Sequence, residues 1–162
     1  MPEDTPIAVD DSAVRDASDR LAARLVESGW SRMPAVVFTC LLCSDSDGLT
    51  SAQLTDYLSI SAASVSQAVR FLSGIGLVDR VRRPGSRREL YRVRNGVWHE
   101  VIARGVLALA RIRDSLRETH AVLGSGSPSA RRMADAVAFY EFYEAQTAEM
   151  LQRWDELQRA RD

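Results

Sequence analysis

The sequence predicts a mainly α-helical protein with one small β element, and three observations lead to this prediction. Apolar residues recur at helical spacing over several stretches, whereas alternation with period two is confined to residues 77–94. The two longest helical patterns, 97–123 and 129–159, follow that β element. The chain has 162 residues, of which 46% are hydrophobic and 27% charged, so it suits one compact domain or a small domain with a helical extension.

The first two helices are expected before residue 44. Apolar side chains recur every three or four residues from Asp11 to Gly29, and Gly29 is a natural helix end. A second helix begins near Arg32–Pro34, because proline is tolerated in a first turn, and runs to Cys43. Its residues are almost uniformly apolar, so we expect this second helix to be buried.

Two short helices are expected next, separated by a tight turn. Thr50 is the N-cap of the first, 51–58, and Gln53 three residues later completes a capping box. Ser61 caps the second, which spans 62–73. Short helix, tight turn and second helix together are the pattern of a helix-turn-helix.

A β-hairpin that carries arginine side chains follows. Residues 77–81 are compatible with a strand, Pro84-Gly85-Ser86 predict a turn, and residues 90–94 alternate with period two. Seven arginines fall within residues 80–94, with only Asp79 and Glu89 as counter-charges. A solvated strand face with a few salt bridges is the alternative interpretation, and so many arginines with so few counter-charges disfavour it.

The positive charge of the chain is concentrated around this hairpin. Residues 61–94 contain eight arginines and two acids, a net charge of +6. Residues 1–60 contain four arginines and ten acids (net −6), and residues 95–162 contain nine and ten (net −1). A basic segment in a chain of net charge −1 is the electrostatic pattern expected of a nucleic-acid contact.

Helix-turn-helix and hairpin together predict a winged helix-turn-helix that binds double-stranded DNA. A second helix with small polar side chains near its start can enter a major groove about 12 Å wide, and guanidinium groups of a wing can reach a narrow minor groove. Cap hydroxyls lie at helix N-termini, which favour phosphate. The predicted DNA-binding residues are Thr50, Ser51, Ser61, Ala63, Ser64, Ser66, Gln67, Arg70, Arg83, Arg87 and Arg88.

The run from Leu49 to Val78 resembles the recognition core of the multiple-antibiotic-resistance regulator (MarR-like) family. Within it the chain reads Leu49-Thr50-x2-Gln53-Leu54 and then Ser61-x3-Val65-Ser66-x2-Val69-Arg70-x-Leu72-x2-Ile75-Gly76-Leu77-Val78. The resemblance covers roughly residues 12–160. Gly29-Trp30-Ser31-Arg32-Met33-Pro34 and Pro84-Gly85-Ser86-Arg87-Arg88 look closer to the GbsR-like branch.

The wing departs from the family pattern at one position. The wider family has an acid two residues before the arginine at the wing tip, and this chain has Ser86 there. An Asp–Arg clamp therefore cannot hold the tip, and we divide the tip role between Arg87 and Arg88.

The resemblance implies a homodimer in which the first and last helices interleave. The residues agree, because the stripe of Tyr140, Tyr143, Met150, Trp154 and Leu157 is too apolar for an isolated exposed helix. Packing back onto the chain's own domain is the alternative. The expected organisation is a flexible acidic N-terminus (1–10), an N-terminal dimerisation helix (11–30), a winged helix-turn-helix DNA-binding domain (31–96) and a two-helix C-terminal dimerisation arm (97–162).

The predicted function is a homodimeric, sequence-specific transcriptional regulator, with repression expected, that binds a pseudo-palindromic operator. A small-molecule effector is a further hypothesis, with Trp30, Phe38 and Trp98 as pocket residues. We expect a cytoplasmic protein with no membrane span, no enzymatic activity and no catalytic, metal or cofactor site. The alternatives are a winged-helix protein-interaction module without sequence-specific DNA binding, and a thiol-based redox sensor that uses Cys40 and Cys43.

Overall fold

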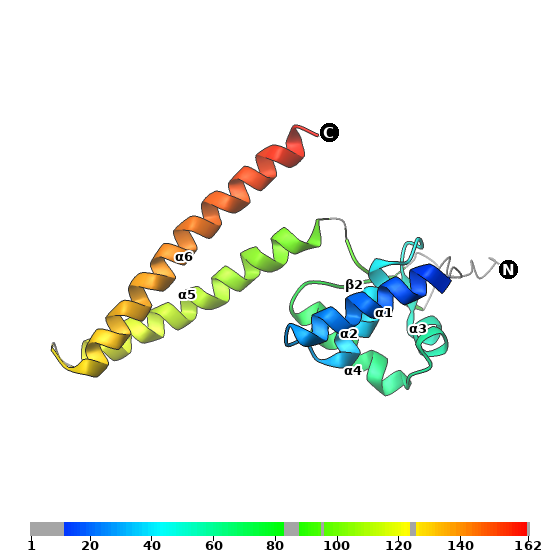
Figure 1. The fold of residues 1–162 in the computed structure, drawn as a ribbon, viewed down its shortest axis with the longest axis horizontal. Coiled ribbons are helices and arrows are strands. Elements are labelled where there is room, and N and C mark those ends of the chain that lie inside the picture. The colour runs from blue at the N-terminus through cyan, green and yellow to red at the C-terminus, as the bar shows by residue number, and fades with distance from the viewer. Residues whose placement is uncertain (1–11, 83–87, 95, 124–125, 162) are drawn as a thin grey trace. The chain divides into compact units, whose positions relative to one another are not determined.

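The computed structural model describes residues 12–82, 88–94, 96–123 and 126–161 (Figure 1). The chain divides into an N-terminal unit, Met1–Val97, and a C-terminal unit, Trp98–Asp162. Most of the described residues are helical, and the strands form one small antiparallel sheet, which confirms the predicted fold class. The elements are α1 (Ser12–Glu27), α2 (Arg32–Leu42), β1 (Leu49–Thr50), α3 (Ser51–Leu58), α4 (Ala62–Gly74), β2 (Asp79–Arg82), β3 (Glu89–Arg92), α5 (Val97–Leu123) and α6 (Pro128–Arg159).

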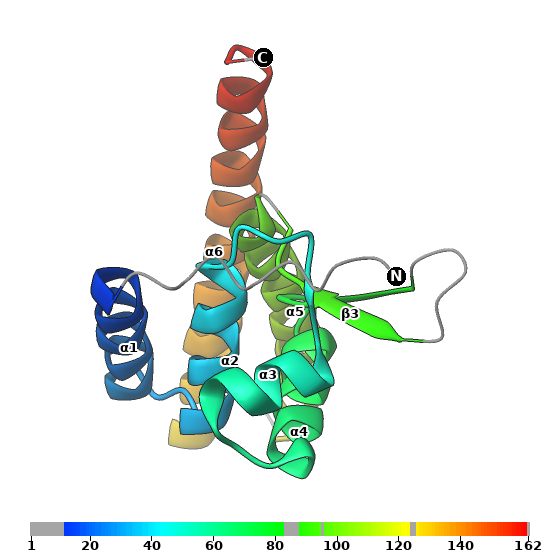
Figure 2. The same ribbon diagram turned by 90° about the vertical axis from the view of Figure 1, so that its right-hand side faces the viewer.

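The core of the N-terminal unit is built around α2, as its apolar sequence predicts. In Figure 2, α2 lies between α1 on one side and α3 and α4 on the other, and α2 contacts all three of these helices. Phe38 is fully buried, and Leu54 of α3 and Leu72 of α4 are buried with it. This packing leaves the opposite side of α4 open to solvent.

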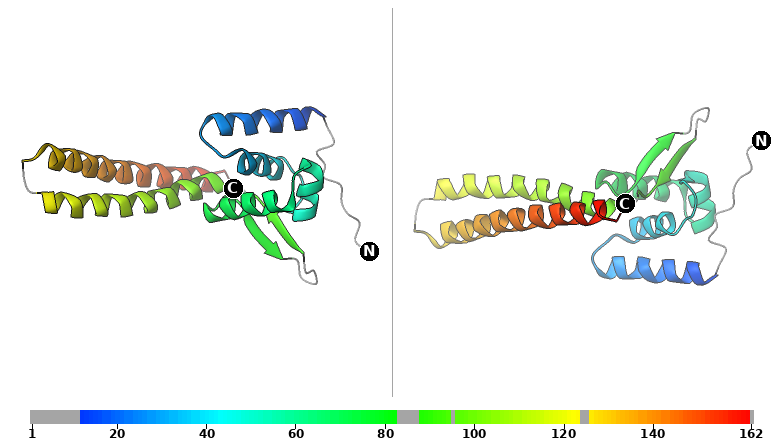
Figure 3. Two further views of the ribbon diagram at one scale, coloured as in Figure 1. Left: turned by 90° about the horizontal axis from the view of Figure 1, so that it is seen from below. Right: turned by 90° about the horizontal axis from the view of Figure 1, so that it is seen from above.

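The sheet has the strand order β1-β3-β2, with both pairs antiparallel. Strand β1 has only two residues, and the period-two pattern did not predict it. It pairs Leu49 with Tyr91 and thereby joins the start of α3 to the hairpin. Gly48 has φ +143°, and a Cβ there would lie 2.9 Å from the carbonyl oxygen of Tyr91, so this junction requires glycine. Figure 3 shows β2 and β3 projecting from the helices as a ribbon.

The C-terminal unit is a hairpin of two long helices, α5 and α6, that diverge away from their connection (Figure 1). Ser127 caps α6 by accepting a hydrogen bond from the backbone N–H of Ala130 at 3.0 Å. Only Ala130 and Thr147 are buried among the described residues from Trp98 to Arg161. Two helices that bury so little of their surface do not form a core of their own.

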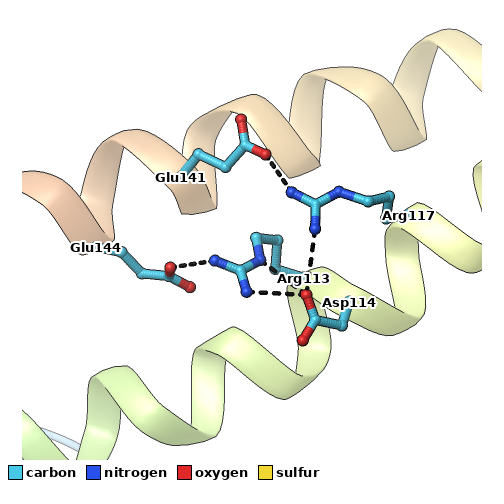
Figure 4. A network of polar contacts seen from close by, with 5 residues as sticks. All are labelled: Arg113, Asp114, Arg117, Glu141 and Glu144. Atoms are coloured by element: carbon cyan, nitrogen blue, oxygen red, sulfur yellow. Dashed lines mark hydrogen bonds and ion pairs between the residues drawn. The ribbon is translucent and has the colours of Figure 1, made fainter.

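An ion-pair network joins the two helices partway along their length (Figure 4). Arg113 of α5 binds Glu144 of α6, and Arg117 binds Glu141. Asp114 lies between the two guanidinium groups and accepts from Arg113 at 2.8 Å. This hydrogen bond, with the nearby carboxylates, raises the pKa of Arg113 above its ordinary value. The network fixes the register of the hairpin, but the exposed partners Arg117 and Glu141 add little stability.

Candidate nucleic-acid interface

Helix α4 presents a small polar face to solvent. Val65, Val69 and Leu72 are buried against the core, which turns the other side of the helix outward. Four of the predicted DNA-binding residues lie together on this exposed side, at spacings of three, four and seven residues. They are Ala63, Ser66, Gln67 and Arg70. The exposed face combines small side chains, which allow close approach, with one amide and one guanidinium group.

The serine pair at the start of α4 forms the helix cap. Ser61 accepts a hydrogen bond from the backbone N–H of Ser64 at 3.1 Å, and the two hydroxyl groups lie 2.9 Å apart. Ser61 is exposed, whereas Ser64 is half-buried. Ser64, three residues before Gln67, therefore lies at the half-buried edge of the exposed face, where its hydroxyl also contacts that of the cap residue Ser61.

The capping box of α3 is present as the sequence predicts. The backbone N–H of Thr50 donates to Gln53 Oε1 at 2.8 Å, and the N–H of Gln53 donates to Thr50 Oγ1 at 3.2 Å. The hydroxyl of Thr50 also donates to Gln53 at 2.9 Å. Thr50 and Ser51 are both half-buried, so the hydroxyl of Thr50 is already engaged before any phosphate approaches.

Ser59, with φ +53°, makes the turn that joins α3 to α4. A left-handed conformation is uncommon for a residue other than glycine, and it ends α3 after only two turns. The N–H of Ile60 then donates to the carbonyl of Thr55 at 3.3 Å. The turn is thus fixed within the backbone, which holds α4 at a defined angle to α3.

Both acids of the wing pair with arginines. Arg82 donates to Glu89 at 3.2 Å across the strand pair, and Arg94 binds Asp79 at 2.7 Å. The described part of the wing still has an excess of positive charge, because Arg80, Arg88 and Arg92 accompany these two ion pairs. The salt-bridge interpretation therefore holds for Arg82 and Arg94, while the described residues of the wing still contain more arginines than acids.

The arginines Arg80 and Arg92 are two candidates that the sequence analysis did not select. Both are exposed, and neither forms an ion pair with another described residue. Arg80 pairs with Tyr91 in the sheet, and Arg92 pairs with Asp79, so the two arginines point to opposite faces of the ribbon. The strand register decides which face of the ribbon each arginine occupies, and this register is known only from the pairing of β2 with β3.

The predicted tip of the wing is only partly described. Arg83, Arg87 and the serine at position 86 lie outside the described residues, whereas Arg88 is described and exposed. The division of the tip role between Arg87 and Arg88 therefore stays a prediction.

The predicted effector residues do not gather into one described cavity. Phe38 is fully buried and packs against Trp30, with ring centroids 5.6 Å apart. Trp98 is 47% exposed and begins the C-terminal unit. A hollow of about 670 Å³ lies elsewhere, among α1, α2 and the end of α3. It is lined mainly by apolar side chains, and on its wall the guanidinium of Arg15 lies 4.4 Å from the ring centre of Tyr57.

Cys40 lies on α2, and Cys43 is the C-cap residue of the same helix. Both are free thiols; Cys40 is buried and Cys43 is half-buried. Burial, together with the neighbouring Cys43, raises the pKa of Cys40 to about 12. Because the thiolate is the reactive form, this disfavours Cys40 as a redox sensor at neutral pH.

The described residues contain no group of three metal-binding side chains, and none of the described helices has the length and hydropathy of a membrane span.

Comparison with known proteins yields two family matches. Residues 41–89 match the MarR family, and residues 96–158 match the MmpR5-like MarR family transcriptional regulators. No curated protein matches the chain. The GbsR-like resemblance stays a prediction, since the second match is to MmpR5-like regulators.

Among solved structures, one described as a crystal structure of a transcriptional regulator has a TM-score of 0.80. It covers 89% of this chain and 99% of its own at 20% identity, which establishes a shared fold. A DNA complex of MepR from S. aureus (TM-score 0.41, 17% identity, 81% and 92% coverage) is much less similar. A MarR protein from Peptoclostridium difficile is also much less similar: its TM-score is 0.40 at 12% identity, and the match covers 90% of this chain and 86% of that protein. We draw no conclusion from these two weaker similarities.

Two separate parts of the chain are thus similar to MarR-family regulators, and the chain shares its fold with a solved transcriptional regulator.

Proposed function

We propose that the chain is a homodimeric, sequence-specific transcriptional repressor that acts in the cytoplasm. The observation that carries this proposal is the exposed face of α4, with Gln67 and Arg70, in the same unit as a wing with surplus arginines. A face that served only to pack against protein would not need this combination of small polar side chains and cations. The polar face and the basic wing match the two requirements of DNA recognition, base readout and phosphate attraction.

In this proposal α4 enters the major groove. Gln67 suits a bidentate contact to adenine, and Arg70, one turn further along, suits guanine or phosphate. The wing contributes Arg88 and whichever of Arg80 and Arg92 faces the DNA, and a narrow minor groove attracts their guanidinium groups. Ala63 and Ser66 allow the helix backbone to come close to the base edges.

Dimerisation is supported by the apolar surface of the C-terminal unit. Twelve large hydrophobic side chains are exposed among its described residues, including Phe139, Phe142 and Leu107. A surface of this kind is expected to bury against a partner, and a two-fold dimer is the commonest arrangement. Two recognition helices related by a two-fold axis would read a pseudo-palindromic operator.

Selection of bound DNA from a random pool tests the proposal directly. We expect an enriched palindrome with two half-sites, and a Gln67→Ala variant should relax the preference at one base of each half-site. Enrichment of no sequence, together with equal binding to promoter and random DNA in a gel shift, would favour the protein-interaction alternative.

An effector would relieve repression only by binding one dimer geometry more tightly than another. The hollow among α1, α2 and α3 offers a mainly apolar site, whereas Phe38 would first have to be uncovered. Thermal-shift screening of apolar and aromatic cationic compounds, followed by a gel shift with each stabilising compound, tests this part of the proposal. A compound that stabilises the protein but leaves its DNA affinity unchanged would not be an effector.

A further inference from the structure

We infer that Gly105 marks the point where α5 crosses the α5 helix of a second copy. This inference rests on the proposed homodimer and adds to it the helix, the face and the residue at the closest approach. It concerns a face of α5, defined by Val101, Gly105, Ala108 and Ile112, which we call the Gly105 face.

No contact among the described residues accounts for a glycine at position 105. It lies in the interior of α5, and a Cβ added there would meet nothing within 4 Å. Its φ is not in the left-handed region, unlike that of Gly48 or Gly76. Glycine is a poor helix former, so a position that tolerates alanine in the monomer but holds glycine points to a close approach from outside the chain.

The surroundings of Gly105 suit contact with a copy of the same helix. Near a two-fold axis each residue meets its own counterpart, so a charged side chain there would face a like charge. Spacings of four, three and four residues place the four members of the Gly105 face on one side of α5, and none of them is charged. The nearest arginines in sequence, Arg104 and Arg111, fall to one side of this face.

The N-terminal unit is a poorer candidate for covering this face. It already buries its apolar residues, and only Leu21, Val26, Leu42 and Phe71 are exposed large hydrophobics among its described residues. The C-terminal unit has twelve, of which Ile102 and Ile112 are on α5 close to Gly105. A second C-terminal unit therefore offers the matching apolar surface that the chain's own first unit does not.

Sedimentation of the full-length protein over a range of concentrations provides the test. We expect Gly105→Leu to raise the dimer dissociation constant by at least about tenfold, because the larger side chain forces the helices apart. Ala121→Leu is the matched control. It makes the same kind of small-to-large change at an exposed position of α5, about 160° around the helix from Gly105, and should leave the constant unchanged.

Each outcome decides a different point. A wild-type chain that stays monomeric overturns the proposed homodimer itself. A dimer that tolerates Gly105→Leu as well as Ala121→Leu leaves the homodimer standing and overturns the crossing at Gly105, and this result would be expected if the N-terminal unit covers the face.

Two further variants keep the inference testable should Gly105→Leu fail to fold. Gly105→Ala favours the helix, so circular dichroism should show unchanged or greater helicity while the dimer dissociation constant still rises. Gly105→Cys, in a chain with Cys40→Ala and Cys43→Ala, should form a disulfide between copies when a mild thiol oxidant such as diamide is added to accept the two electrons, because the crossing would hold the two Cα atoms within the roughly 4.4–6.8 Å that this bond requires. Absence of this disulfide in a chain that dimerises would contradict the crossing.

Discussion

The two units of this protein differ in how they bury apolar side chains. In the N-terminal unit, four helices and a small sheet pack around a core that includes Phe38, Leu54 and Leu72, and few large hydrophobic residues remain exposed among the described residues. In the C-terminal unit, two helices that together contain 59 residues bury only Ala130 and Thr147 beyond Val97. The difference teaches that the first unit has a core of its own, whereas the second leaves most of its apolar surface exposed.

This difference also separates the two proposed tasks. A self-contained core allows α4 and the wing to be held rigidly for DNA, with Gly48 and the β1–β3 pairing joining the two parts. A helical arm without its own core suits assembly, because the exposed apolar surface becomes the interface. Five measurements sharpen or break this comparison.

The largest effect is expected in the core of the N-terminal unit. Phe38→Ala should lower the free energy of unfolding by about 3–5 kcal/mol, since it removes a fully buried ring and leaves a cavity. Urea denaturation measures this loss. It should be similar at high and low protein concentration, and a loss that disappears on dilution would contradict a self-contained core.

In the C-terminal unit the effect should depend on association. Trp154→Ala should raise the dimer dissociation constant by roughly 30-fold, about 2 kcal/mol, because an exposed tryptophan on α6 is a natural anchor for an interface. Arg153→Ala is the control at the neighbouring position. It removes an exposed ion pair with Glu149 and should change the free energy of dimerisation by less than about 1 kcal/mol. Equal effects of the two variants would argue against an apolar interface on α6.

DNA binding should respond to single arginines of the N-terminal unit. Arg70→Ala should weaken binding to the selected operator by about 1–3 kcal/mol and flatten its salt dependence. Arg80→Ala and Arg92→Ala, on opposite faces of the ribbon, should differ from each other, and the larger loss identifies the face that meets DNA. Arg24→Ala removes an exposed ion pair with Glu27 on α1 and serves as the control. Unchanged binding by all three test variants would remove the proposed interface.

The capping box offers a smaller test of the same unit. Thr50→Ala should cost about 1 kcal/mol of stability, because it removes the acceptor for the N–H of Gln53. Thermal unfolding at two protein concentrations measures this cost. The loss should be the same at both, whereas Ser127→Ala, which removes the cap of α6, should show a loss that varies with concentration.

The smallest effect at neutral pH is expected for Cys40. In the folded protein the Cys40 thiol stays protonated at neutral pH, because burial raises its pKa to about 12. In the unfolded chain the same thiol loses its proton near pH 9.0. Its contribution to stability is therefore complete below pH 9 and is lost as the pH rises toward 12. Iodoacetamide at pH 8, followed by mass spectrometry, should label Cys43 faster than Cys40. Rapid oxidation of Cys40 by peroxide would revive the redox alternative.

Much of this arrangement was predictable from local patterns. The helix boundaries agree with the apolar periodicity to within a few residues, and the capping residues Thr50 and Ser61 accept the backbone hydrogen bonds expected of them. The exposed grouping of Ser66, Gln67 and Arg70 also follows from helical spacing once the buried face is known. These features depend on residues close together in the chain.

Other features required contacts between distant residues. Strand β1 is too short to show a periodic pattern, and only its pairing with β3 reveals it. The pairing of Arg82 with Glu89 and of Arg94 with Asp79 depends on strand register, which also separates Arg80 from Arg92. Phe38 illustrates the same limit. An aromatic residue on an apolar helix is more often core but can line a pocket, and the structure places Phe38 at 0% exposure.

The sequence by itself determined the order of the helices, the basic hairpin and the polar face of the second short helix, since spacing, capping and charge are local properties. The tertiary structure decided which of the described wing arginines pair with acids, which aromatic side chain fills the core and which unit lacks a core. Burial and ion pairing are properties of segments brought together in space, so no pattern along the chain could supply them.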